Sequence, residues 1–102
     1  MKNLFKEGNK RYIRGDYKGA IKCFTKLIEK EPNNIYGYIN LGIAKMDIGD
    51  YNEAIDCFSK AIELEPNNAD AYRNRALAYY SLNKEDMALI DYKKSGELSL
   101  YK

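Results

Sequence analysis

The chain has 102 residues, of which 45% are hydrophobic and 31% are charged, and its net charge is +2. This balance is typical of a soluble protein of one domain, and it excludes a disordered tail and a membrane protein. The sequence contains no histidine, so it lacks the commonest general base and metal ligand, and we expect neither an enzyme nor a cofactor.

The N-terminal segment becomes charged before the apolar core of a signal peptide can form, so we expect a cytoplasmic protein. Two cysteines do not make a disulfide framework in such a protein. Cys23 and Cys57 are therefore predicted to be two separate thiols.

The sequence repeats itself at an interval of 34 residues, which is the distance from Pro32 to Pro66. Residues 15–17 (Gly-Asp-Tyr) return as residues 49–51, and residues 31–34 (Glu-Pro-Asn-Asn) return as residues 65–68. Such self-similarity indicates stacked units that share one core. In this register a single domain of three units covers residues 1–34, 35–68 and 69–102, with no linker left over.

The first unit is predicted to hold two helices on either side of Gly15, which suits the left-handed turn after a helix. Asp16 can then cap the second helix. Pro32 cannot continue a helix interior, so the second helix is expected to end near it, and Asn33-Asn34 can cap the next helix, as Asn67-Asn68 can in the second unit.

The second unit has the same punctuation, with Gly49 at the turn and Pro66 at the end. Asp50 and Glu53 have the spacing of a capping box at the start of its second helix. Its apolar residues recur at helical rather than strand spacing. They are Leu41, Ala44 and Ile48 in the first helix, and Ala54, Ile55, Phe58, Ala61 and Ile62 in the second.

The third unit departs from this pattern at two places. Asn83 replaces the turn glycine, and it can still adopt the left-handed conformation, so the helix pair is expected to survive. Ser95 and Gly96 lie near the end of the last helix and predict weaker packing and fraying there.

The repeated unit resembles the tetratricopeptide repeat over the whole chain. Small residues stand where the two helices of each unit cross closely, alanines follow in the second helix, and aromatic residues come after them. These residues are Gly8, Gly42 and Ala76, then Ala20, Ala54 and Ala88, then Phe24, Phe58 and Tyr92. The resemblance implies an all-α fold, a right-handed α-solenoid of three antiparallel helix pairs with six helices in total. The alternative is an unrelated six-helix bundle.

In this family the first helices line a concave groove that binds protein or peptide segments. Carried over by position, the resemblance implies a groove formed by Phe5, Asn9, Tyr12, Tyr36, Ile39, Asn40, Ile43, Met46, Arg73, Asn74, Leu77 and Tyr80. Core packing is the alternative role for each apolar member. Large aromatic side chains suit the anchoring of a peptide through apolar contacts. We therefore expect a protein or peptide partner and no small-molecule substrate.

One subclass of the family holds the C-terminal carboxylates of chaperones with a set of Lys, Asn, Asn, Lys and Arg. Asn9 and Asn40 match the two amides of that set. Phe5, Asp70 and Asn74 stand where its three cations are required. The resemblance therefore does not extend to this clamp, although Arg73 and Arg75 flank Asn74 and can compensate in part.

Charge is divided unevenly between the units. The first unit is strongly basic and the second is acidic, and Lys18, Lys22, Lys26 and Lys30 form one stripe along a helix. Such a stripe is usually a solvated face, and the alternative is an anionic partner. Nucleic acid and membrane partners are not expected, because recognised binding motifs are missing.

The array stops without the polar terminal helix that commonly follows the last unit in this family. The exposed apolar end is predicted to consist of Tyr92, Leu98, Leu100 and Tyr101. A second copy of the chain, a partner protein or further sequence can cover it. Self-assembly into a homo-oligomer through this end is therefore the alternative function.

Overall fold

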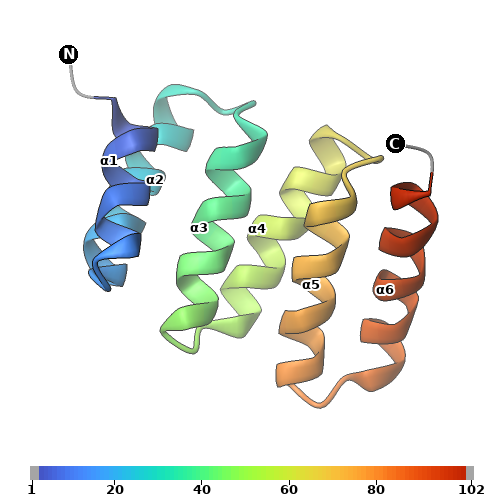
Figure 1. Ribbon diagram of the computed structural model, residues 1–102. Coiled ribbons are helices and arrows are strands. Elements are labelled where there is room, and N and C mark those ends of the chain that lie inside the picture. The colour runs from blue at the N-terminus through green and yellow to red at the C-terminus, as the bar shows by residue number, and fades with distance from the viewer. Residues whose placement is uncertain (1–2, 101–102) are drawn as a thin grey trace.

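Six helices follow one another along the chain as three antiparallel pairs (Figure 1). The structure is a computed structural model that describes residues 3–100, and this part of the chain contains no strand. The helices are α1 (Leu4–Ile13), α2 (Tyr17–Lys30), α3 (Ile35–Asp47), α4 (Tyr51–Leu64), α5 (Ala69–Ser81) and α6 (Glu85–Ser99). The predicted all-α array of helix pairs is confirmed. Between residues 3 and 100, no helix is long and apolar enough to cross a membrane.

Asparagine starts the first helix of every pair. The Oδ1 atoms of Asn3, Asn34 and Asn68 each accept a hydrogen bond from the backbone N–H three residues further on, at 3.0, 2.9 and 3.0 Å. Each bond satisfies one of the donors that a helix leaves free at its N-terminus. Of the predicted capping pairs Asn33-Asn34 and Asn67-Asn68, the second asparagine is the cap in each case.

The turn inside each pair depends on a residue with a left-handed backbone. Gly15 and Gly49 have φ values of 82° and 85°, and Asn83 has a φ of 60°. Asparagine tolerates this region better than most residues, so the third pair keeps the same turn without glycine, as the sequence predicts.

The second helices are capped less regularly. Asp16 accepts a hydrogen bond from the Gly19 N–H at 2.9 Å, as expected. The capping box predicted for α4 is wrong, because the Asp50 side chain makes no capping hydrogen bond. Glu53, the other predicted member, instead accepts a hydrogen bond from Lys45 Nζ at 3.0 Å. Because Lys45 of α3 binds the Glu53 carboxylate, that carboxylate does not form the hydrogen bond that a capping box requires.

Phe24 and Phe58 are the largest fully buried side chains among the described residues. Each ring lies against the glycine of the first helix in its own pair, Gly8 or Gly42. A Cβ atom built on Gly42 would lie 2.5 Å from Phe58 Cε1. This close approach explains why the two positions carry glycine within a helix, where that residue is otherwise unfavourable.

We expect Gly42→Ala to destabilise the protein, because overpacking of about 1–3 kcal/mol exceeds the gain in helix propensity. Gly96→Ala is the matched control. Nothing lies within 4 Å of a Cβ atom at Gly96, so this change should stabilise α6 by about 0.5–1 kcal/mol. Urea unfolding of both variants measures the difference. Equal effects of the two substitutions would contradict the packing described for Phe58.

The third pair is built differently. Ala76 occupies the position of Gly8 and Gly42, and its Cβ atom leaves no room for a ring placed like those of Phe24 and Phe58. Tyr92, the equivalent aromatic residue, is accordingly 37% exposed.

The predicted weakening at the end of α6 is only partly correct. Ser95 is buried and its Oγ donates a hydrogen bond to the carbonyl oxygen of Ala69 at 3.0 Å. This bond ties the last two turns of α6 to the start of α5, and the helix continues to Ser99. At Gly96, in contrast, nothing lies within 4 Å of a Cβ atom built on the residue.

Candidate peptide-binding groove

The first helices of the three pairs approach one another, whereas the second helices do not. Over residues 3–100, α1 contacts α3 and α3 contacts α5, but α2, α4 and α6 make no contacts with one another. The array therefore curves toward the side of α1, α3 and α5, and Figure 1 shows these helices alternating with their partners along it. The concave side is the one on which the sequence places its groove.

At the junction of α1 and α3, two polar pairs cross the groove. Asn40 Nδ2 donates a hydrogen bond to Asn9 Oδ1 at 2.9 Å, and the Tyr12 hydroxyl donates to Asp47 Oδ2. The hydrogen bond to Asp47, with burial, raises the pKa of Tyr12 to about 12, so the hydroxyl remains a donor at neutral pH. A cavity of about 120 Å³ lies beside these pairs and is closed by Phe24 and Ile43.

Three large side chains of the predicted groove are exposed to solvent. Tyr36 is 51% exposed, Leu77 is 42% exposed and Tyr80 is 61% exposed. Tyr36 lies in the first turn of α3, while Leu77 and Tyr80 are one helical turn apart on α5. Ile43 and Met46 are half-buried and pack against the cluster that contains Phe58. Phe5 is also half-buried and meets Phe24 edge to face, with 6.3 Å between the ring centroids.

Two residues of the predicted groove lie mainly in the interior. Ile39 is 3% exposed and packs with Phe58 and Ala78 in the core. Ile39 is therefore a core residue, and its prediction as a residue that lines the groove is wrong. Asn74 is 9% exposed and its Nδ2 donates to the Asp70 carbonyl oxygen at 2.8 Å, so little of its amide is left for a ligand.

The arginines near Asn74 are already paired. Arg73 Nη2 lies 2.9 Å from Asp70 Oδ1, and the two side chains are 53% and 38% exposed. Arg75 points away from the groove. Its Nε and Nη2 atoms donate to the two carboxylate oxygens of Asp91 at 2.7 and 2.9 Å, and Nη1 donates to Ser59 Oγ at 3.1 Å. The compensation expected from Arg75 is therefore absent.

The family model described as TPR repeat matches residues 8–48 and 44–83, which is more than half of the chain. The chain belongs to the tetratricopeptide repeat (TPR) family. No curated protein matches it.

Several solved structures are similar to this chain over more than nine-tenths of its length. The first TPR of Spaghetti (RPAP3), bound to the HSP90 peptide SRMEEVD, has a TM-score of 0.93 and 29% identity over 97% of this chain and 79% of that chain. The second TPR of the same protein, bound to the same peptide, has a TM-score of 0.90 and 28% identity, covering 93% and 88%. MamA MSR-1 C2 has a TM-score of 0.87 and 31% identity, covering 92% of this chain and 54% of that chain.

The two cysteines of the TPR core are separate thiols, as predicted. Cys57 packs against the cluster formed by Phe24, Leu27 and Ala44. Burial raises the pKa of the Cys57 thiol to about 11, so it remains protonated at neutral pH and behaves as a small apolar side chain.

The end of the TPR array exposes more apolar surface than the sequence suggests. Leu89 is 65% exposed and Ile90 is 68% exposed, and neither belongs to the predicted end. The sequence feature that could have indicated an exposed Leu89 is its position in the repeat, which is that of Ile21 and Ile55 in the earlier units. Of the predicted residues, Tyr92 and Leu100 are exposed and Leu98 is half-buried. Tyr101 lies outside the described residues.

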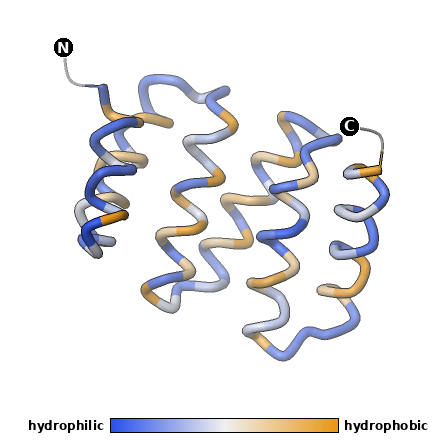
Figure 2. The backbone as a smooth tube through the Cα atoms, in the orientation of Figure 1, coloured by the Kyte–Doolittle hydropathy of each residue, from blue (hydrophilic) through white to orange (hydrophobic). Residues whose placement is uncertain are grey.

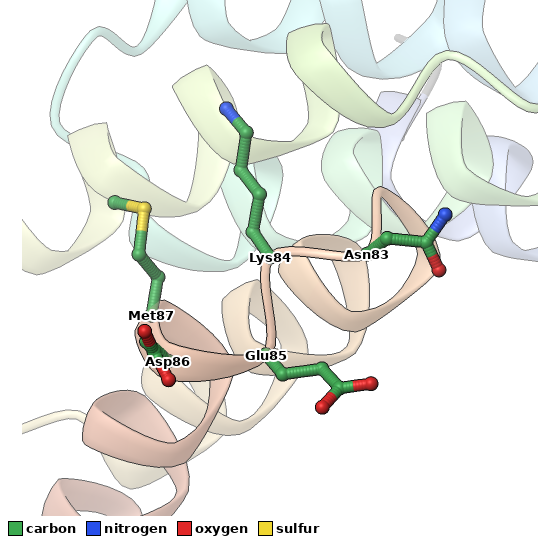
Figure 3. A pocket seen from close by; sticks show the side chains of 5 residues that line it. All are labelled: Asn83, Lys84, Glu85, Asp86 and Met87. Atoms are coloured by element: carbon green, nitrogen blue, oxygen red, sulfur yellow. The ribbon is translucent and has the colours of Figure 1, made fainter.

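A shallow depression at the turn between α5 and α6 is a poor candidate site. Asn83, Lys84, Glu85, Asp86 and Met87 line it. Figure 3 shows that their side chains point away from one another, with Lys84 and Met87 on one side and Asn83 and Glu85 on the other. No two functional groups converge there on a point where a ligand can sit.

Proposed function

We propose that this TPR chain is a protein-interaction module whose concave groove binds a peptide segment through apolar anchors. The observation that carries the proposal is the exposure of three large side chains on the first helices, Tyr36 on α3 and Leu77 and Tyr80 on α5. Large, rigid side chains of this kind supply much contact area at a small cost in conformational entropy. Close structural relatives in complex with a peptide support a peptide as the ligand.

The chemistry of the groove favours a different peptide from the acidic one in those relatives. Phe5, Asp70 and Asn74 provide no cation at the three positions where a carboxylate clamp needs one. The amides of Asn9 and Asn40 are bonded to each other, and Arg73 is paired with Asp70. A buried carboxylate without a cationic partner is costly. The proposed ligand is therefore a neutral or weakly basic segment with apolar side chains.

Selection from a displayed peptide library, with the full chain as bait, tests this proposal. We expect enriched peptides to carry at least two large apolar residues. The double variant Tyr36→Ala with Ile43→Ala should weaken binding of a selected peptide by roughly 30-fold, or about 2 kcal/mol, because both anchor contacts are lost.

Ile90→Ala is the matched control, since Ile90 is exposed on α6 away from the groove, and its affinity should be unchanged. The peptide SRMEEVD should not be retained by the wild-type chain. Enrichment of acidic C-terminal peptides, or full binding by the double variant, would refute the proposed groove.

A further inference from the structure

Asp47 differs from the other carboxylates of the first helices, because it has no cationic partner among residues 3–100. The first helices carry Glu7 on α1, Asp47 on α3 and Asp70 on α5. Glu7 pairs with Arg11, and Asp70 pairs with Arg73. Asp47 is exposed and forms no ion pair with another described residue. Its negative charge is therefore not compensated within this part of the chain.

The place of Asp47 in its helix adds to this negative charge. Asp47 is the last residue of α3, and a helix C-terminus carries a partial negative charge that disfavours an acid and favours a cation. The three first helices end on the same side of the array, at the lower edge in Figure 1. This edge of the groove is therefore electronegative at Asp47, and a positive group of a ligand is attracted to it.

Apolar surface surrounds this charge on its own helix. Figure 2 shows that the second half of α3 is mostly apolar, and Lys45 and Asp47 are its two charged residues. Lys45 is bonded to Glu53 of α4. Asp47 is therefore the charge that this half of α3 leaves available to a ligand.

The packing of the repeat does not require an acid at this position. Ile13 on α1 and Ser81 on α5 hold the same place as Asp47, and Ile13 is 83% exposed. Within the described chain, Asp47 has one hydrogen bond through its side chain, which Oδ2 accepts from the Tyr12 hydroxyl. This bond holds the carboxylate in place and leaves Oδ1 open to a ligand.

Tyr12 also lines the cavity of about 120 Å³ between α1 and α3, whose remaining walls are Asn9, Phe24, Asn40 and Ile43. The amides of Asn9 and Asn40 are bonded to each other, so the cavity favours an apolar group. In another protein an apolar cavity of about 150 Å³ holds a benzene molecule. The cavity beside Tyr12 is therefore large enough for a small aliphatic side chain.

The Tyr12 side chain spans the distance from this cavity to the Asp47 carboxylate. In an extended peptide, alternate side chains lie on the same side and are about 6–7 Å apart, which is close to the length of a tyrosine side chain. An aliphatic residue in the cavity thus brings the residue two positions away within reach of Asp47.

We propose that the groove selects a peptide in which a lysine or arginine stands two positions from an aliphatic residue. The aliphatic side chain enters the cavity between α1 and α3, and the cation pairs with Asp47. This inference rests on the proposed function and specifies the charge of its ligand. Asp47 is the residue that determines this specificity, and Tyr12 positions its carboxylate.

Selection from a random displayed peptide library, with the full chain as bait, compares the wild type with Asp47→Asn. The substitution removes the charge and keeps an oxygen that can accept from Tyr12. Peptides enriched by the wild type should carry Lys or Arg two positions from Val, Leu or Ile. Peptides enriched by the variant should keep the aliphatic residue and lose the preference for a basic one.

The affinities of one selected peptide, and of its analogue with the basic residue replaced by glutamine, measure the pairing. The wild type should bind the analogue roughly 2- to 5-fold more weakly, as expected for an exposed ion pair, and the difference should shrink at high salt. Asp47→Asn should bind both peptides equally.

Asp56→Asn is the matched control, because Asp56 is an exposed carboxylate on α4 rather than on a first helix. This variant loses the same charge from the molecule and should discriminate between the two peptides as the wild type does. Equal effects of the two variants would show that only the net charge of the chain matters, and would overturn the inference.

Two further results would overturn the role of Asp47 and leave the groove itself intact. One is a preference for basic residues that persists in Asp47→Asn. The other is enrichment of basic residues at no fixed distance from an aliphatic residue. In both cases Tyr36→Ala with Ile43→Ala would still weaken binding. Failure of the wild type to enrich any peptide would overturn this inference together with the proposed function.

Discussion

Asp91→Cys is expected to destabilise the protein by about 3 kcal/mol, because it leaves the guanidinium of Arg75 buried without its partner. Asp91 has 4% of its side chain exposed and Arg75 has 20%. The two form a bidentate pair across α5 and α6 with N–O distances of 2.7 and 2.9 Å. The guanidinium also lies over the rings of Tyr72 and Tyr79, at 5.6 and 5.8 Å from their centroids.

The repeat itself supplies the compensating change. In the second unit, Leu41 and Cys57 occupy the positions of Arg75 and Asp91. The double variant Arg75→Leu with Asp91→Cys recreates that apolar pair within the third unit. It should recover most of the lost stability, since replacing a buried ion pair by apolar residues is often neutral or stabilising.

Urea unfolding of the wild type, both single variants and the double variant forms a complete cycle. The coupling free energy should be favourable and on the order of 2 kcal/mol or more. If the losses of stability from the two single changes are additive, Arg75 and Asp91 are not energetically coupled, and each stabilises the third repeat separately.

Phe58→Ala is expected to cost about 3–5 kcal/mol, because it leaves a cavity where a fully buried ring stood. Phe58 belongs to the cluster that joins α3, α4 and α5. A cavity at Phe58 therefore weakens the packing inside the central pair and its interface with the third pair at once. The melting temperature should fall by more than about 10 °C.

Tyr92→Ala is the matched control at the same repeat position. Tyr92 is 37% exposed, and its loss should cost only about 1 kcal/mol, since its ring is only partly buried whereas that of Phe58 is fully buried. Thermal unfolding followed by circular dichroism compares the two variants. Similar losses of stability in the two variants would mean that Tyr92 is packed like Phe58. This would contradict the conclusion that the Cβ atom of Ala76 leaves no room for a ring in that position.

Much of the fold could be predicted because it is specified locally. Asn34 and Asn68 cap helices with their own side chains, Gly49 and Asn83 make left-handed turns, and Pro66 ends a helix. Each of these effects acts within a few residues of the chain. Repetition at 34 residues then placed equivalent residues at equivalent points of the array.

The candidate site was less accessible to sequence reasoning. Ile39 and Tyr36 lie in the same repeat unit and both fit the apolar pattern of α3. Ile39 is nevertheless buried in the core, whereas Tyr36 is half-exposed. A first helix of the array packs against helices on two sides, so its apolar face is broad. Helical spacing cannot say which edge of such a face meets the groove.

The sequence by itself determined the period, the six helices and their turns, because capping and backbone conformation are local properties. Only the tertiary structure decided that Arg75 pairs with Asp91, 16 residues away, that Lys45 takes Glu53 from the predicted capping box, and that Leu89 is left uncovered. These outcomes depend on distances between different helices, and such distances are fixed only when the helices pack.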